Sequence, residues 1–191
     1  MKPILLEFPV SFETERLVIA SYVRGDGKEF FQLLQANYRY LQEELNEIKT
    51  IKSIEDAEEY VRFKHISWLS RERFVPKLIE RASGRMIGQL WIEPRWDRMI
   101  FEIGYFIEEK SQGNGYVTEA VQKIIGILFS ELKANKLEIH TKATNLKSIR
   151  IAERCGFTKE AYLRERSRTN SGEIVDLLIF GLLRSEFPFL G

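Results

Sequence analysis

The chain has 191 residues, of which 44% are hydrophobic and 30% are charged, a composition typical of a soluble domain with its own core. Its 29 basic and 28 acidic residues leave a net charge of +1, so we expect no general attraction to nucleic acid or anionic membranes. One cysteine and two histidines exclude an internal disulfide and a Cys/His zinc cluster, and we expect no metal site.

The N-terminal segment MKPILLEFPV contains an apolar run that Glu7 and Pro9 interrupt. This run is too short for a signal peptide. The longest uncharged apolar run, 177–183, is far shorter than a membrane span. We therefore expect a cytoplasmic protein that does not enter a membrane.

Hydrophobic periodicity predicts strands and helices along the whole chain. We expect strands at 15–22, 75–82, 86–94, 99–108 and 136–144, and a final hairpin around the turn 169–173. We expect helices at 25–45, 53–73, 117–135 and 145–157. This order predicts a single α/β (α+β) domain with a mixed, mostly antiparallel central sheet flanked by helices.

Local signals support the predicted helices. Asp26 is a candidate N-cap for the first, and Ser53 with Asp56 forms a variant of the capping box for the second. The helix at 117–135 carries one apolar side, made by Val117, Ala120, Val121, Ile124, Leu128 and Leu132.

Two glycines, Gly113 and Gly115, stand directly before the helix at 117–135, although glycine is a poor helix former. They could make a tight turn. They could also leave a bare backbone through which an anion approaches the helix N-terminus, where the first amides lack partners and the dipole is positive. The spacing leaves both readings open. It fits neither a dinucleotide fingerprint, because Thr118 stands at the third glycine position, nor a Walker loop.

The segments EIGYFIEEKSQGNGYVTEA (102–120) and NLKSIRIAERCGF (145–157) resemble the GNAT acetyltransferases, which bind acetyl-CoA. The loop pattern of that family is Gln/Arg-x-x-Gly-x-Gly/Ala, and here its first position departs to Lys110. TERLVI (14–19) and GRMIGQL (84–90) match the branch that includes the ribosomal-protein N-acetyltransferases. The resemblance covers Thr14 to Phe187 and implies one GNAT-like domain over residues 1–191.

The resemblance also implies how acetyl-CoA binds. Loop amides would hold the pyrophosphate, and the residues carried over are Gln112, Gly113, Asn114, Gly115, Tyr116 and Val117. The pantetheine arm would lie like an added strand along Tyr105, Phe106 and Ile107, in a gap between splayed strands at 100–108 and 136–143. Asn145 would bond the pantetheine amides.

The implied reaction is attack of a neutral amine on a thioester carbonyl. The resemblance makes Ser148 a candidate donor to the leaving sulfur, because the tyrosine that many family members use would stand at Ala152. A helix-start role for Ser148 stays open. Glu102, a carboxylate within a strand, is the candidate base, although it could also be an exposed or ion-paired residue. For an α-amine, with a pKa of about 8, bulk water could serve instead.

The acceptor is left open by the sequence. We expect its site between the two N-terminal helices and the final hairpin, where aromatic residues are available: Tyr38, Tyr40, Trp68, Trp91 and Tyr162. We read His65 and His140 as structural residues without evident partners, and Cys155 as a buried apolar residue.

Three hypotheses follow. The first is an acetyl-CoA-dependent N-acetyltransferase that acts on a protein N-terminal α-amine. The second is the same chemistry on a small amine, such as a polyamine, aminoglycoside or amino acid analogue. The third is a CoA-binding sensor without turnover. An acidic cleft would favour a polycation, and a neutral aromatic cleft a peptide end. The resemblance is also compatible with a homodimer.

Overall fold

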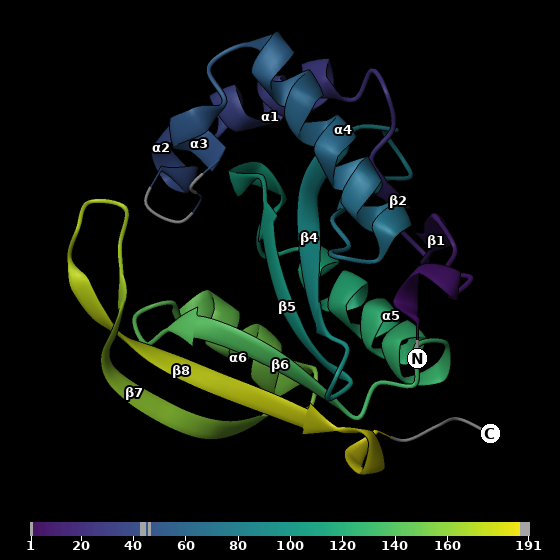
Figure 1. Ribbon diagram of the computed structural model, residues 1–191. Helices are drawn as coiled ribbons and strands as arrows, with labels where there is room; N and C mark the ends of the chain where they lie inside the picture. Colours follow the sequence, from purple (N-terminus) through teal and green to yellow (C-terminus); the bar gives the residue numbers. More distant parts are fainter. Residues whose placement is uncertain (1, 43–44, 46, 188–191) are drawn as a thin grey trace.

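The computed structural model describes residues 2–42, 45 and 47–187 (Figure 1). Within them, eight strands form one sheet in the order β1-β2-β3-β4-β5-β6-β8-β7. The strands are β1 (Ser11–Glu13), β2 (Leu17–Ser21), β3 (Pro76–Glu80), β4 (Met86–Arg95), β5 (Ile100–Ile107), β6 (Lys136–Lys142), β7 (Thr158–Arg168) and β8 (Ile174–Leu183). The helices are α1 (Gly27–Ala36), α2 (Tyr38–Leu41), α3 (Glu47–Thr50), α4 (Ile54–Ser70), α5 (Tyr116–Ser130) and α6 (Leu146–Arg154), with 3-10 turns at Pro3–Leu5, Glu109–Ser111 and Arg184–Glu186.

These elements confirm the expected mixed sheet, in which only β5 and β6 pair in parallel. The predicted helix at 25–45 is wrong in its extent, because α1 ends at Ala36 and a separate turn, α2, follows. The break lies at Asn37, whose side chain donates to the Leu33 carbonyl at 2.9 Å and accepts from the Glu109 amide at 2.8 Å. Such side-chain bonds compete with helix continuation. Positions 43 and 44 of that predicted helix lie outside the described residues, and strand β1 was not predicted.

The two predicted N-caps have different outcomes. Ser53 and Asp56 form a reciprocal capping box, with bonds of 3.0 and 2.8 Å between each backbone amide and the other side chain. Asp26 occupies the cap position of α1, but its carboxylate does not cap the helix. It accepts from the Val23 amide and pairs with Lys77 Nζ at 2.6 Å. The nearly buried Lys77 thus pairs with the Asp26 carboxylate that was expected to cap α1.

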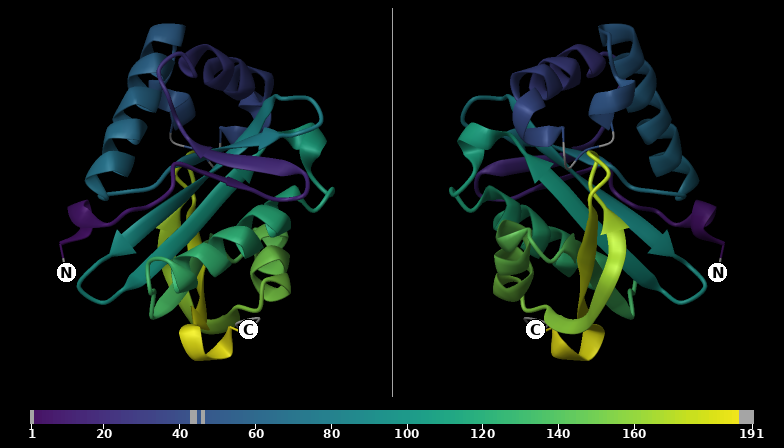
Figure 2. Two further views of the ribbon diagram at one scale, coloured as in Figure 1. Left: turned by 90° about the vertical axis from the view of Figure 1, so that its right-hand side faces the viewer. Right: turned by 90° about the vertical axis from the view of Figure 1, so that its left-hand side faces the viewer.

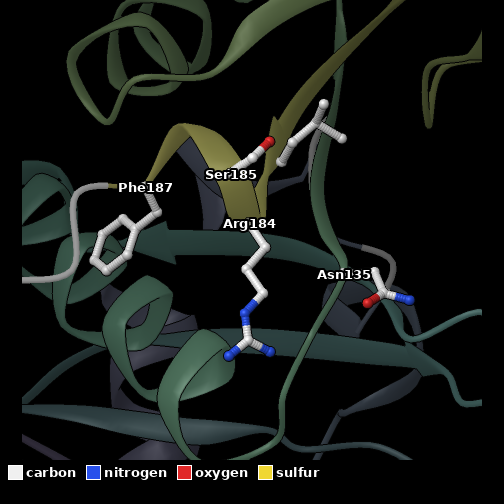
Figure 3. A pocket seen from close by; sticks show the side chains of 5 residues that line it. Asn135, Arg184, Ser185 and Phe187 are labelled. Carbon is white, nitrogen blue, oxygen red and sulfur yellow. The ribbon is translucent and has the colours of Figure 1, made fainter.

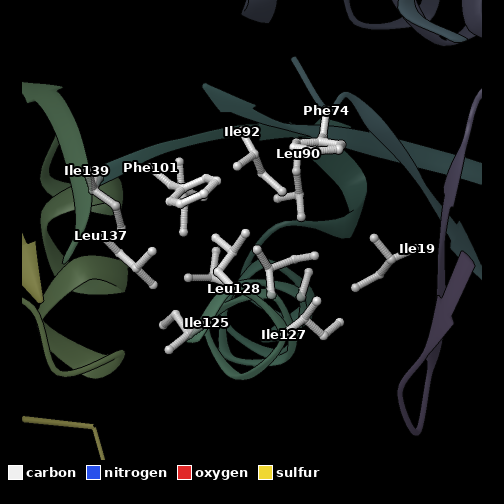
Figure 4. Packing of buried hydrophobic residues seen from close by; sticks show 14 of the residues in the cluster. Ile19, Phe74, Leu90, Ile92, Phe101, Ile125, Ile127, Leu128, Leu137 and Ile139 are labelled. Carbon is white, nitrogen blue, oxygen red and sulfur yellow. The ribbon is translucent and has the colours of Figure 1, made fainter. Parts of the chain in front are cut away.

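The main core lies between the sheet and α5. Every apolar residue predicted for one side of this helix is buried, and strand residues such as Ile19, Leu90 and Phe101 surround it (Figure 4). A second buried cluster lies beneath α1 and α4 and includes Phe106. Figure 2 shows α5 and α6 together in one layer and α1 to α4 grouped apart from them. The sheet is therefore held from two sides by separate cores.

The pairing of β5 with β6 stops early. Their register runs only from Ile100 opposite Lys136 to Glu102 opposite Glu138. Beyond this point β5 stays paired with β4 up to Ile107, and β6 stays paired with β8 up to Lys142. Figure 1 shows the two strands diverging. The predicted splay of 100–108 and 136–143 is thereby confirmed, and we call the opening between the strands the fork.

We expect Leu128→Ala to lower the free energy of unfolding by about 2–5 kcal/mol, because Leu128 is fully buried in the middle of α5 and the truncation leaves a cavity. Leu69→Ala is the matched control, since Leu69 on α4 is half exposed and should cost less than about 0.5 kcal/mol. Urea denaturation of both variants measures the difference. Equal losses would contradict the placement of α5 at the centre of the core.

Candidate active site

The loop before α5 adopts the backbone conformation that requires glycine. Gly113 and Gly115 have φ angles of 77° and 81°, in the left-handed region that disfavours side chains. A Cβ added at Gly113 would meet no atom within 4 Å. Lack of space therefore does not explain this glycine; its backbone conformation does.

The same loop offers unpaired donors. Among the described residues, no hydrogen bond is donated by the backbone amides of 113–118, and the side-chain nitrogen of Gln112 is buried without a partner. Gly113, Asn114 and Gly115 are exposed. Amides of this kind at a helix N-terminus suit an anionic group such as a pyrophosphate. The donor set thus fits the phosphates expected from the sequence.

Arg16, which directly precedes β2, stabilises the loop before α5. The sequence analysis did not assign this residue to the site. Its guanidinium donates to the Asn114 carbonyl at 2.8 Å and to Glu119 at 2.7 Å, and lies 4.6 Å from the centre of the Tyr116 ring. The sequence feature that could have identified Arg16 is its position in the TERLVI segment, which is part of the family resemblance. A surface pocket beside the loop is lined by Glu15, Arg16, Gly115, Thr118, Glu119, Gln122 and Arg154.

The side chains of Tyr116 and Val117 are used within the protein. Val117 is buried in the main core, and the Tyr116 hydroxyl donates to Glu80 at 2.5 Å. That bond to a carboxylate raises the pKa of Tyr116. What these two predicted residues can offer a ligand is therefore their backbone amides.

The predicted pantetheine residues border the fork. Phe106 points into the second cluster and Ile107 into the main core. Between β5 and β6, no pairing is present beyond Glu102 in the described chain, so the edge of β5 from 103 to 107 is open. Such an edge can accept an extended chain as an added strand.

Asn145 and Ser148 lie together at the start of α6. The Asn145 side-chain oxygen accepts from the Ser148 amide at 3.1 Å and caps the helix. Its side-chain nitrogen has no hydrogen bond within the part of the chain that the structure describes. Ser148 is 9% exposed, and its hydroxyl lies 2.9 Å from that of Tyr105. Ser148 therefore has both a capping contact and a hydroxyl contact.

The mouth of the fork is bridged by Lys147. Its ammonium donates to the Gln112 side-chain oxygen at 2.6 Å and lies 5.9 Å from the centre of the Tyr40 ring. The start of α6, the loop before α5 and α2 thus meet at one place. Lys110, where the loop departs from the family pattern, pairs with Glu108 at 3.5 Å.

Glu102 lies where the fork begins. Its carboxylate is 3.4 Å from His140 Nδ1 and 3.6 Å from Arg95, while His140 Nε2 is 3.1 Å from Glu138. The sequence showed no evident partner for His140, whereas the structure places it between two carboxylates, and Glu102 belongs to a cluster of ionisable residues. Burial, opposed by His140, raises the pKa of Glu102. Burial also disfavours ionisation of Glu138, but hydrogen bonds from Lys136 and His140 lower its pKa overall.

The residues expected at the acceptor site are only partly together. Trp91 lies opposite Gly104, where any Cβ would overlap its indole ring. Trp68 is fully buried in the main core, so its expected exposure to an acceptor is wrong. Tyr162 is exposed and bonds Asp176. Trp68 is not available to an acceptor because it lies on the side of α4 that packs into the main core.

The final hairpin reaches the N-terminal helices. Asn170, at its turn, accepts from Lys49 Nζ at 2.8 Å and donates to the Gln42 carbonyl at 2.8 Å. The sequence-based expectation placed the acceptor site between these parts of the chain. The contact brings the hairpin turn and the α2–α3 region together beyond the open end of the fork (Figure 1).

The other residues considered in the sequence analysis are His65, which bonds another side chain, and Cys155, whose thiol is unreactive. His65 Nδ1 is 3.2 Å from the Ser21 hydroxyl, so His65 also has a partner. Burial raises the pKa of Cys155 to about 11, which keeps the thiol protonated. A second pocket, lined by Asn135, Leu183, Arg184, Ser185 and Phe187, lies by the end of β8 and contains none of the predicted site residues (Figure 3).

Among the described residues, no group of three or more His, Cys, Asp or Glu side chains is arranged to hold a metal ion. The helices in this part of the chain are all too short or too polar to span a membrane.

Several known proteins are similar to this chain in sequence. Three Bacillus proteins are 35 to 38% identical to the chain, but the matched parts span only 38 to 48% of their length. The ribosomal-protein-serine acetyltransferase of Escherichia coli is 26% identical over 82% of this chain and 87% of that protein. The spermidine N(1)-acetyltransferase of Vibrio cholerae is 28% identical over 71% of this chain and 76% of that protein.

The fold has solved counterparts. The microcin C7 self-immunity acetyltransferase MccE, solved with acetyl-CoA and AMP, superposes with a TM-score of 0.83 at 19% identity, over 92% of this chain and 97% of that one. The acetyltransferase (GNAT) domain family matches residues 16–158, which include the loop, the fork and the start of α6. The chain therefore belongs to the GNAT acetyltransferase family, whose members use acetyl-CoA.

Proposed function

We propose that this protein is an N-acetyltransferase that moves an acetyl group from acetyl-CoA to an amine. The observation that carries the proposal is the unpaired amides of 113–118 beside the open edge of β5. The amides supply donors for the pyrophosphate, and the edge supplies a place for the pantetheine arm. Family membership supports the same chemistry.

In the proposed reaction the amine nitrogen attacks the thioester carbonyl carbon directly, and the carbon–sulfur bond breaks. Glu102 takes the amine proton, since it lies where the fork begins and its pKa is raised. Ser148 donates to the sulfur from the start of α6. Holding the amine and the thioester together supplies much of the rate.

We propose a protein N-terminal α-amine as the acceptor. Arg95 lies 3.6 Å from Glu102 and from Glu138, and Lys136 lies 3.0 Å from Glu138, so cations accompany the carboxylates of this region. Trp91 adds an aromatic surface over β5. A neutral aromatic surface suits a peptide end better than a polycation. The name of the Escherichia coli relative supports a protein as the acceptor, whereas the name of the Vibrio cholerae relative keeps a polyamine as the alternative.

Release of free CoA from acetyl-CoA tests the function. We expect turnover with short peptides that have free N-termini, and weaker turnover with polyamines and aminoglycosides. Preference for a small amine would change the acceptor but keep the reaction. Tight CoA binding without turnover on a broad panel would favour a CoA-binding sensor.

The homodimer stays a prediction that size-exclusion chromatography with light scattering can test.

We expect Gly113→Ala to weaken CoA binding roughly tenfold, since a left-handed φ costs about 1–2 kcal/mol for alanine and the loop shifts to relieve it. Gly84→Ala is the matched control, because Gly84 has a φ of 69°, also has no atom near an added Cβ, and lies in the β3–β4 turn. Calorimetric titration with CoA measures both. Equal effects would show that backbone strain, and not the loop, weakens binding.

We expect kcat/KM to fall as the pH is lowered through the pKa of Glu102, because only its ionised form accepts a proton. The raised pKa places this fall above the ordinary value of about 4.3. Glu102→Gln should remove this dependence and lower kcat/KM about 100-fold or more. Glu93→Gln, opposite Glu102 on β4, should keep the dependence but move it to lower pH, because the charge of Glu93 contributes to raising the pKa of Glu102. An unchanged pH profile in Glu102→Gln would mean that water, and not Glu102, takes the proton.

A further inference from the structure

Tyr105 was expected to contribute only its backbone, but its side chain has a specific contact. In the described chain its hydroxyl has two partners, and both belong to Ser148: the side-chain oxygen at 2.9 Å and the backbone carbonyl at 3.4 Å. Tyr105 lies on β5 and Ser148 on α6, which follows β6. The contact therefore joins the two sides of the fork.

The surroundings of Ser148 leave its hydroxyl as the group that can act. Its amide is taken by the cap from Asn145 at 3.1 Å, and it is nearly buried. One turn later stands Ala152, which is fully buried and has no hydroxyl. On this face of α6 the hydroxyl available to donate to a sulfur atom is therefore that of Ser148, and its orientation depends on its partner Tyr105.

Counting hydrogens shows what Tyr105 can do. Each hydroxyl has one hydrogen, so when Ser148 donates to another atom, Tyr105 must be the donor in the bond between the two hydroxyls. Tyr105 can turn its hydrogen from the Ser148 carbonyl to the Ser148 hydroxyl oxygen, because both lie within reach. The donation strengthens the Ser148 hydroxyl as a donor, since hydrogen bonds in a chain polarise one another.

The state of Tyr105 suits this task. Burial raises the pKa of Tyr105 far above its ordinary value, and the bond to Ser148 lowers it by less. The phenol therefore keeps its proton at any working pH. Tyr105 then serves as a fixed donor and not as a source of protons.

We propose that Tyr105 is a positioning residue that orients the Ser148 hydroxyl toward the sulfur of acetyl-CoA. This inference rests on the proposed function. The amine nitrogen forms a bond to the carbonyl carbon, the electron pair of the carbon–sulfur bond leaves on sulfur, and the amine proton passes through Glu102 to water. The products are the amide, the CoA thiolate and one proton. Ser148 donates a hydrogen bond to the thiolate, and both hydroxyls keep their protons.

Tyr105→Phe removes the hydroxyl and keeps the ring. We expect kcat to fall about tenfold, the worth of one hydrogen bond, with the acetyl-CoA KM and the CoA dissociation constant within about twofold of wild type. Tyr22→Phe is the matched control, since Tyr22 is fully buried and its hydroxyl bonds Gln89 at 2.7 Å. It should leave kcat unchanged. Thermal unfolding of both variants measures any loss of stability.

A double-mutant cycle separates positioning from a structural role. Once Ser148→Ala has lowered kcat, adding Tyr105→Phe should cost nothing more, because Tyr105 acts through Ser148. Additive losses in kcat, or a CoA affinity that falls as much as kcat, would overturn the inference while wild-type turnover upholds the proposed function. A wild-type protein that releases no CoA with any amine would overturn the proposed function and this inference together.

Discussion

The site depends on one incomplete contact, the parallel pairing of β5 with β6 that stops at Glu102 and Glu138. A sheet normally pairs every inner strand along its length, because unpaired backbone groups are costly when buried. Here each strand keeps its outer neighbour, so the sheet tolerates the opening. The cost is limited to the two strand edges that face each other across the fork, and an extended ligand can pair with the edge of β5.

Two separate cores make this opening stable. The helix α5 packs against both halves of the sheet, through residues such as Phe101 on β5 and Leu137 on β6 (Figure 4). The second core attaches α1 and α4 to β4 and β5 and includes Phe106. The backbone of β5 is thus held from both faces, while its edge toward β6 stays free. Rigid positioning of this kind favours binding, because little order must be gained when a ligand arrives.

Polar contacts then place chemistry around the fork. Arg16 holds the loop before α5, Lys147 crosses the mouth, and Tyr105 reaches Ser148 from the opposite strand. At the closed end, Glu102 meets His140 and Arg95. All of these contacts except the Arg95–Glu102 pair join segments distant in the sequence. The arrangement suits the different demands of the proposed reaction: anion binding at the loop, and proton acceptance and hydrogen-bond donation along the fork.

The sequence by itself determined most of the elements and the position of the glycine loop, but it missed strand β1 and the end of α1 at Ala36. Periodicity identified the apolar side of α5, and the glycines at 113 and 115 marked a loop whose backbone is left-handed at both positions. Only the tertiary structure decided the partners of the polar side chains. His140 sits between two carboxylates, Asp26 pairs with Lys77 instead of capping α1, and Trp68 is buried. The reason is physical: local patterns report backbone preference and burial, whereas a side-chain contact depends on the register of strands that the chain brings together from far apart.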